Sequence, residues 1–272
     1  MSGTIFEKPD KVPRSGVVQS VERAMAILLV LGQDEEGSRL TEVAHRTGLS
    51  VSTVHRLLTT LERQKFVQFD QSSSMWHVGR AAFTTGSAFV RQRNFVAPAL
   101  AYLRRLRDLT RETANLGVID DGEVLVLSQV ESREIMRAIT RVGGHVPMIS
   151  SGMGKAILAT YEPADINAIV ANHGMRRFTA NSLVRSKELW SQLDTIRAEG
   201  YAVDDEEFLP GLRCIAAAVY NQQGEALCAI SVSGLAQRLT DERVPEIGRL
   251  VRDMARELTL ALGGNMPGSN EP

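Results

Sequence analysis

The segment 39–69 constrains the fold more than any other part of the chain, because three spacings coincide in it. Ala44 is small where two helices would have to cross closely, and Gly48, four residues later, can take the positive φ of a tight turn. Six residues further, an apolar row with helical spacing begins. Its members are Val54, Leu57, Leu58 and Leu61. Together these spacings predict a helix-turn-helix.

The second helix of this motif has a first turn suited to DNA. Ser50 is placed to cap it, and the following residues offer short donors and a cation for phosphates and base edges. These residues are Ser52, Thr53, His55 and Arg56. Two acidic residues in 39–69 stand against five basic ones: Arg39, Arg46, Arg56, Arg63 and Lys65. Because the net charge of the whole chain is −1, contact with DNA would have to come from this local basic surface.

The segments on either side of the motif extend the prediction. An apolar stripe over residues 21–31 predicts a preceding helix, with Ser20 in position to cap it. The runs "FVQFD" and "MWHVG", separated by "QSSS", predict a β-hairpin, which would be a wing. A helical hairpin that serves only packing is the plain alternative. The order of helix, helix-turn-helix and hairpin favours the DNA-binding interpretation, although His55 alone would be an ordinary surface histidine.

The rest of the chain predicts an α+β domain with mostly antiparallel strands. Asp120, Asp121 and Gly122 separate two apolar runs as a hairpin turn does, and "NQQG" separates another two. Helical patterns occupy 153–160, 163–172, 186–199 and 241–261. We therefore expect a flexible arm at 1–18, a winged helix-turn-helix at 19–80 and a linker helix at 81–95. An α/β domain follows at 96–262, and a flexible tail at 263–272.

Composition narrows the class of protein. The chain has two cysteines, too few for a disulfide framework, and no charged-then-apolar leader at its start. Its strongest early apolar run, 24–31, is far shorter than the ~20 residues that a membrane span needs. No H-x-x-x-H or C-x-x-C spacing indicates a metal, and no cofactor motif is present. We expect a cytoplasmic protein without metal or cofactor.

The motifs, in their order and spacing from about residue 18 to residue 263, resemble the IclR family of bacterial transcription regulators. They include "VQSVERAMAIL", "LTEVAHRTGLSVSTVHRLLTTLE", "TRVGGHVPM", "GMGKAILA" and "GYAVDDEEFLPGLRCIAAAVY". The resemblance implies a winged helix-turn-helix, a linker helix and a GAF-like effector-binding domain. It also implies a regulator that acts as a homodimer, or as a dimer of dimers (a homotetramer), on palindromic operators in double-stranded DNA. The most similar members are repressors, but the sequence leaves repression and activation both open.

The stretch "SSGMGKAIL" invites comparison with a phosphate-binding loop. Such a loop requires G-x-x-x-x-G-K-[ST], but Ile149 stands at the first glycine position and Ala156 replaces the hydroxyl. What remains is a helix start at Gly152 and Met153, where unpaired N–H groups favour an anion. The plain alternative is an ordinary first turn with Lys155 in solvent.

Polar residues further along the chain support an anion site. Ser231 and Ser233 are two residues apart on a predicted strand, so their hydroxyls share a face. Asp204 follows a strand-like run, and we expect the acids after it, at 205–207, to form a solvated turn. Cys214 begins the next strand, where an inert buried thiol is the plain interpretation.

The resemblance assigns a ligand to these residues. The chain is similar to the members of the family that sense glyoxylate or pyruvate, small 2-oxo acids. Their effector is held by residues matching Gly152, Met153, Asp204, Cys214, Ser231 and Ser233, with apolar walls matching Val146 and Leu212. Ala138 is small at a position where other members of the family can have bulkier residues, and we expect this position to influence the size of the accepted 2-oxo acid. A bare Asp204 carboxylate would repel an anion, unless it accepts from a ligand hydroxyl or a serine, or holds a proton.

Other functions stay open at this stage. A regulator of the same type could sense a different small carboxylate, such as an acid from aromatic catabolism. In an enzyme, Cys214 could be a nucleophile with His145 or His173 as its base, but no spacing brings either histidine to it. A pure interaction module would not need a polar pocket in its second domain.

Overall fold

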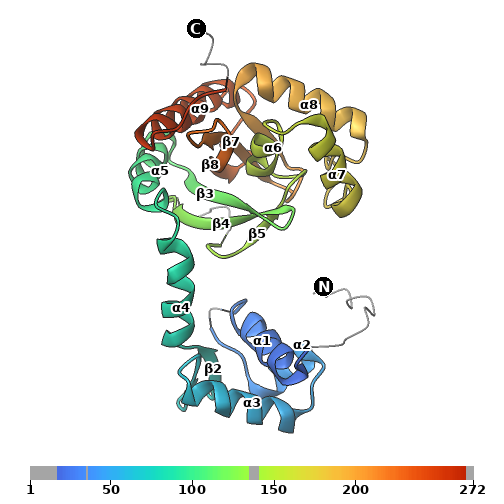
Figure 1. Ribbon diagram of the computed structural model, residues 1–272, viewed down its shortest axis with the longest axis vertical. Helices are drawn as coiled ribbons and strands as arrows, with labels where there is room; N and C mark the ends of the chain where they lie inside the picture. Colours follow the sequence, from blue (N-terminus) through green and yellow to red (C-terminus); the bar gives the residue numbers. More distant parts are fainter. Residues whose placement is uncertain (1–16, 35, 135–140, 268–272) are drawn as a thin grey trace. The chain divides into compact units, whose positions relative to one another are not determined.

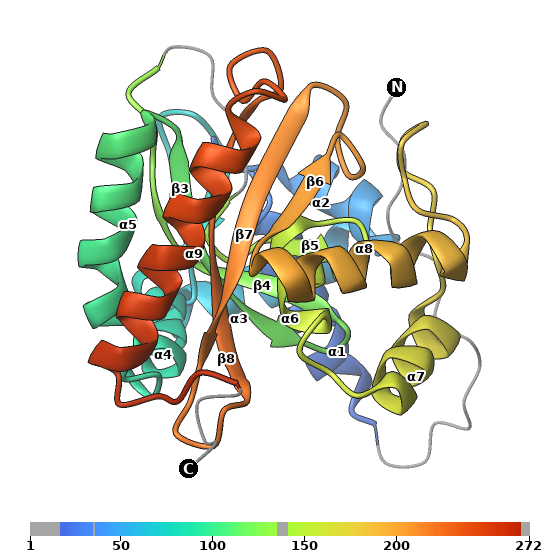
Figure 2. The same ribbon diagram turned by 90° about the horizontal axis from the view of Figure 1, so that it is seen from above.

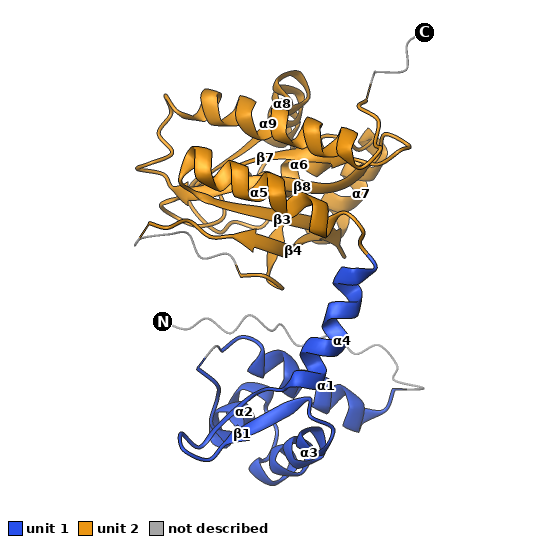
Figure 3. Cartoon of the chain, turned by 90° about the vertical axis from the view of Figure 1, so that its left-hand side faces the viewer, with its two compact units in different colours: residues 1–92 blue, residues 93–272 orange. Residues whose placement is uncertain are grey.

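The computed structural model describes residues 17–34, 36–134 and 141–267. The chain divides into two compact units, Met1–Gln92 and Arg93–Pro272, which Figure 3 shows in two colours. The division falls inside the segment that the sequence assigns to a linker helix. Each unit has its own hydrophobic core.

The first unit is a winged helix-turn-helix, as predicted (Figure 1). Its elements are α1 (Gln19–Leu31), α2 (Leu40–Thr47), α3 (Val51–Arg63), β1 (Val67–Asp70), β2 (Met75–Val78) and α4 (Arg80–Arg91). The apolar sides of α1, α2 and α3 meet around Ile27, Ala44 and Val54, with Trp76 of the hairpin closing the cluster. Strands β1 and β2 pair antiparallel and form the predicted wing.

Two local expectations in this unit are wrong. Ser20 does not cap α1, because the helix begins one residue earlier, at Gln19, and its N-cap Val18 offers no side-chain hydrogen bond. The helix predicted over 81–95 ends at Arg91, and a turn separates it from the next helix, which starts at Val96. No residue of α4 is buried within this chain.

The second unit is built on a six-stranded sheet of order β5-β4-β3-β8-β7-β6, in which all neighbours are antiparallel. The strands are β3 (Thr113–Asp120), β4 (Glu123–Val130), β5 (His145–Pro147), β6 (Ala202–Asp205), β7 (Leu212–Tyr220) and β8 (Ala226–Leu235). The helices are α5 (Val96–Thr110), α6 (Gly152–Leu158), α7 (Pro163–His173), α8 (Ser186–Glu199) and α9 (Val244–Ala261).

Helices cover both faces of this sheet (Figure 2). Helices α5 and α9 lie side by side on one face, against β3 and β7. Helix α6 lies on the other face, against β6, β7 and β8, with α8 packed behind it. Both predicted hairpins are confirmed, and Asp121 and Gly122 turn the first with φ values of 47° and 75°.

Two hydrogen bonds bear on the outer part of the chain. Gly264 and Asn265, in the segment assigned to a tail, are hydrogen-bonded: their N–H groups donate to the carbonyls of Thr259 and Asn221, at 2.8 and 2.9 Å.

Across residues 17–34, 36–134 and 141–267, no helix combines the length and the apolar character needed to cross a membrane.

Candidate functional site

Cross-strand register gathers the predicted pocket residues on one face of the sheet. Asp204 on β6 lies opposite Cys214 on β7, and Cys214 lies opposite Ser233 on β8. Directly opposed residues point to the same face of a sheet. Ser231, two positions along β8 from Ser233, is therefore on that face too, and it lies opposite Asn115 of β3. Residues distant in sequence thus form a continuous polar patch.

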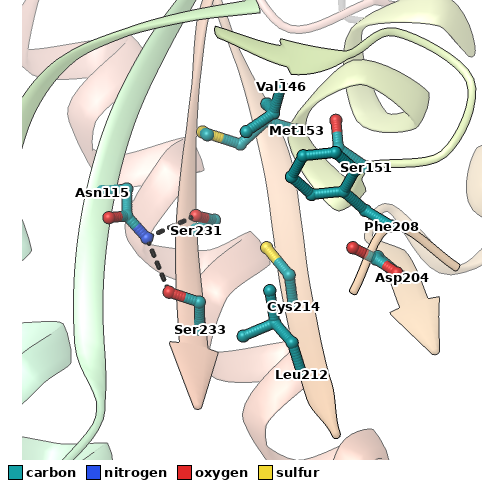
Figure 4. Close-up of a pocket in the computed structure, with 10 residues that line it drawn as sticks. All are labelled: Asn115, Val146, Ser151, Met153, Asp204, Phe208, Leu212, Cys214, Ser231 and Ser233. Atoms are coloured by element: carbon teal, nitrogen blue, oxygen red, sulfur yellow. Dashed lines mark hydrogen bonds between the residues drawn. The ribbon is translucent and has the colours of Figure 1, made fainter. Parts of the chain in front are cut away.

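This patch is the floor of a pocket (Figure 4). The pocket encloses an empty volume of about 320 Å³, part of which opens to solvent. Its lining residues are Asn115, Val146, Ser151, Met153, Asp204, Phe208, Leu212, Cys214, Ser231 and Ser233. All the predicted effector-binding side chains are among them, whereas Gly152, which was predicted to act through its backbone, is not a lining residue. Ala138, which we expected to influence ligand size, lies outside the described residues.

The start of α6 approaches the floor closely, which explains its glycines. A Cβ on Gly152 would lie 3.0 Å from the Cys214 carbonyl oxygen and 3.1 Å from its sulfur, and the Gly152 N–H faces that sulfur. A Cβ on Gly154 would lie 2.2 Å from the Met148 carbonyl oxygen. Ser151 caps the helix by accepting from the Gly154 N–H at 3.1 Å. Gly152 therefore brings its backbone N–H down to the polar patch, and Gly154 lets the first turn of α6 pack against Met148.

Burial sets the protonation of the two ionisable groups in the pocket. It raises the pKa of Asp204 to about 7; the Lys155 ammonium opposes this shift and the Glu207 carboxylate adds to it. Burial, with a further contribution from Asp204, raises the pKa of the Cys214 thiol to about 12. Near neutral pH the pocket therefore contains a protonated thiol and a carboxyl group close to its titration midpoint.

A buried ion pair near Asp204 overturns one expectation, the solvated turn at 205–207, and rules out the plain alternative of a solvated Lys155. Lys155 is fully buried rather than solvated, and its ammonium donates to Glu207 as well as to the Gln192 side chain and the Val203 carbonyl, both at 2.6 Å. Glu207 is only 2% exposed, so it does not belong to a solvated turn. The reason is the packing of α6 on the sheet, which directs Lys155 inwards.

Three lining residues were not predicted: Asn115, Ser151 and Phe208. Asn115 had a detectable signal, since it is a single amide in the apolar strand run "ANLGVI" and is 1% exposed. Buried amides require partners, which a polar site provides. Phe208 had none, because it belongs to the connection between β6 and β7, whose path depends on the Lys155–Glu207 pair.

Neither histidine that the sequence offered as a base lies at Cys214. His145 is exposed and pairs with Asp120 at 2.8 Å, while His173 ends α7 beside Gly122. Neither histidine lines the pocket. Within the described part of the chain, no group of three or more His, Cys, Asp or Glu residues is arranged to hold a metal ion.

The helix-turn-helix of the first unit presents α3 as an exposed surface. Gly48 takes the expected left-handed turn, with φ of 67°, and Ser50 caps α3 by accepting from the Thr53 N–H at 3.2 Å. Ser52, His55 and Arg56 are exposed, and Thr53 is half-buried. Opposite this surface, Val54 and Leu58 are fully buried in the core of the unit. The predicted DNA-facing side chains therefore share one accessible side of α3.

The basic surface of 39–69 carries less free positive charge than the count of its basic residues suggests. Arg46 forms an ion pair with Asp34 and also donates to the Gln33 side chain, so its charge is largely neutralised within the fold. Asp34 precedes the segment in which the charges were counted. Arg56, in contrast, stands exposed on α3.

Comparisons with known proteins agree over almost the whole chain. Residues 20–71 match the family described as "IclR helix-turn-helix domain", and residues 87–260 match "Bacterial transcriptional regulator IclR C-terminal". The acetate operon repressor of Salmonella typhimurium is 39% identical over 254 residues, covering 93% of each chain. The repressor AllR of Escherichia coli K12 is 36% identical over 245 residues, covering 90% of each.

A solved structure agrees as well. The IclR of Thermotoga maritima superposes with a TM-score of 0.77 at 26% identity, over 90% of this chain and 98% of that one. The order of domains, the helix-turn-helix and the long matches to curated repressors lead to one conclusion. The chain belongs to the IclR family of bacterial transcriptional regulators and is a DNA-binding regulator, not an enzyme.

Proposed function

We propose that this protein is a cytoplasmic repressor of a metabolic operon whose hold on operator DNA responds to a small 2-oxo acid, glyoxylate first and pyruvate second. The observation that carries the proposal is the convergence of Ser231, Ser233 and the start of α6, at Ser151 and Met153, on one small pocket. Hydroxyl and backbone donors suit a carboxylate, and the apolar walls at Val146 and Leu212 suit the carbon skeleton of a small acid.

The raised pKa of Asp204 weakens the main objection to an anionic ligand. A carboxyl group with a pKa of about 7 is protonated in half of the molecules at that pH, and in this form it donates rather than repels. Cys214, as a neutral thiol, adds no negative charge beside the ligand.

Titration calorimetry tests the ligand directly. We expect heat and saturable binding with glyoxylate, weaker binding with pyruvate, and none with acetate, which lacks the oxo group. Binding of an aromatic acid such as benzoate, without binding of glyoxylate, would show that the family assignment holds but that the ligand class is different.

Replacing Arg56 by alanine should weaken operator binding by about 1–3 kcal/mol if the side chain reads a base. If it contacts only phosphate, the loss should be equal on all sequences and the dependence on salt should become shallower. Fluorescence anisotropy at several salt concentrations separates these cases. Arg80→Ala, a change of the same kind outside α3, is the matched control. Unchanged affinity and salt dependence in the Arg56 variant would rule out the proposed docking.

The protein should be a homodimer or a dimer of dimers, because one α3 helix reads too few base pairs for useful specificity. Exposed apolar side chains provide surface for association: Phe83 is 77% exposed on α4, and Met25 and Leu29 are 48% and 62% exposed on α1. Light scattering at micromolar concentration should give at least twice the chain mass of 29.8 kDa. A monomer that still binds one half-site specifically would contradict this.

Glyoxylate affinity should fall as the pH rises through about 7, because the anion binds better to protonated Asp204. Below that pH the dissociation constant should be nearly flat; above it, affinity should fall by up to about tenfold per pH unit, with proton uptake on binding. Calorimetry at about pH 6 and about pH 8.5, in buffers of different ionisation enthalpy, measures both effects. Asp204→Asn should abolish the slope. A slope that persists in this variant would assign the proton to another group.

A further inference from the structure

A chain of two side-chain amides, Gln129 and Asn115, leads to the end of the pocket floor away from Asp204. Gln129 on β4 lies opposite Asn115 on β3, which lies opposite Ser231 on β8. The Gln129 amide donates to the Asn115 Oδ1 at 2.8 Å. The Asn115 Nδ2 in turn donates to the Ser231 hydroxyl at 3.2 Å and to the Ser233 hydroxyl at 3.0 Å (Figure 4).

The direction of these hydrogen bonds determines what the serines can offer. A serine hydroxyl has one hydrogen and two acceptor lone pairs. Each serine hydroxyl oxygen accepts a hydrogen bond from Asn115. The hydrogen of the serine hydroxyl is therefore not used in that contact and can be donated to another acceptor. Asn115 is 1% exposed and both serines are at most 3% exposed, so water does not readily replace the arrangement.

Asn115 could in principle present either end of its amide to the serines. Its oxygen would accept both hydroxyl hydrogens and leave nothing for a ligand, whereas its NH₂ group leaves both free. In the structure Gln129 donates to the oxygen from the opposite side, which is the contact that the second arrangement requires. The Ser231 hydroxyl also donates to the Cys214 sulfur. Because a thiol is a much weaker acceptor than a carboxylate, a bound carboxylate would take over this hydrogen.

We propose that Gln129 and Asn115 are positioning residues that fix Ser231 and Ser233 as hydrogen-bond donors to the ligand, so that the pocket selects an acceptor-rich carboxylate. The proposal rests on the proposed function for the identity of the ligand, but the orientation of the hydroxyls belongs to the protein alone. It adds to the site two residues that do not themselves have to touch the effector.

Neutron diffraction on crystals of the ligand-free, deuterium-exchanged protein tests the orientation without any effector. We expect both Asn115 Nδ2 deuterons to point at the serine oxygens, and the serine deuterons to point away from Asn115. Serine deuterons directed at the Asn115 oxygen would overturn the proposal. This result does not depend on whether glyoxylate is the ligand.

A double-mutant cycle tests whether Gln129 and Asn115 act together in ligand binding. Glyoxylate affinity is measured by calorimetry for each variant, and all replacements are uncharged. Gln129→Met should weaken binding about threefold to tenfold in the wild-type background, as expected for loss of a neutral hydrogen bond. In the Asn115→Leu background, the same change should have almost no effect, because the link is already broken. Thermal unfolding confirms that each variant is folded, and Gln223→Met, in the exposed β7–β8 turn, is the control.

The outcomes separate the two proposals. If the effects of Gln129→Met and Asn115→Leu simply add, the side chains act independently and the positioning role is wrong. If glyoxylate gives no heat with the wild type while the neutron structure shows the expected orientation, the proposed ligand fails and the donor arrangement stands.

Discussion

Replacing Lys155 by methionine should destabilise the second unit by about 3–5 kcal/mol, because it leaves the Glu207 carboxylate buried without its partner. Lys155 is fully buried and Glu207 is 2% exposed. The second carboxylate oxygen of Glu207 already has no hydrogen-bond partner, so it has no alternative when the ammonium is removed. Chemical denaturation, followed by a probe in the second unit such as Trp190 fluorescence, measures the loss.

The matched controls for this prediction are Lys187→Met and a double variant. Lys187 is exposed on α8, so its replacement should change the stability by no more than about 0.5 kcal/mol. Lys155→Met combined with Glu207→Leu removes both charges and should recover most of the loss, since buried pairs are often replaceable by apolar residues. A single variant as stable as the wild type would show that the pair does not hold the connection between β6 and β7 in place.

Replacing Ser231 by alanine should weaken glyoxylate binding by about 1.5–3 kcal/mol, or roughly tenfold to a hundredfold, the usual range for a hydrogen bond to a charged group. The double variant Ser231→Ala with Ser233→Ala should lose more, because both donors of the floor disappear. Operator affinity without ligand should stay nearly unchanged, since both serines belong to the second unit. Titration calorimetry measures the ligand, and anisotropy measures the DNA.

The control for this experiment is Ser191→Ala, on the exposed side of α8. It should match the wild type in both assays. Equal glyoxylate affinity in wild type and Ser231→Ala would mean that the ligand binds without this hydroxyl and that the proposed site is wrong.

Local sequence patterns predicted most of the fold. The small residue, glycine and apolar row of 39–69 predicted α2, α3 and the turn at Gly48, and the Asp-Gly turn predicted the β3–β4 hairpin. These features depend on spacing and backbone preference, which a sequence displays directly. The prediction that Ser231 and Ser233 face the same side of the sheet was correct for the same reason, because side chains two residues apart on a strand share a face.

The predictions that were wrong or missing concern residues whose surroundings are formed by segments distant in the sequence. Lys155 and Glu207 are 52 residues apart, and nothing local distinguishes a buried charge pair from two solvated charges. Asn115 becomes part of the pocket only because β3 pairs with β8, 116 residues away from it at Ser231. Strand order is a tertiary property, so the place of Asn115 in the polar floor followed from the structure and not from the sequence pattern.

The most direct test of the central claim is the affinity of the full-length protein for the DNA upstream of its own gene, measured by fluorescence anisotropy with and without glyoxylate. We expect specific binding to this DNA, a change of at least about fivefold on addition of glyoxylate, and no change in Ser231→Ala at the same concentration. Specific DNA binding that is identical with and without glyoxylate or pyruvate in the wild type would contradict the claim that this pocket senses a small 2-oxo acid.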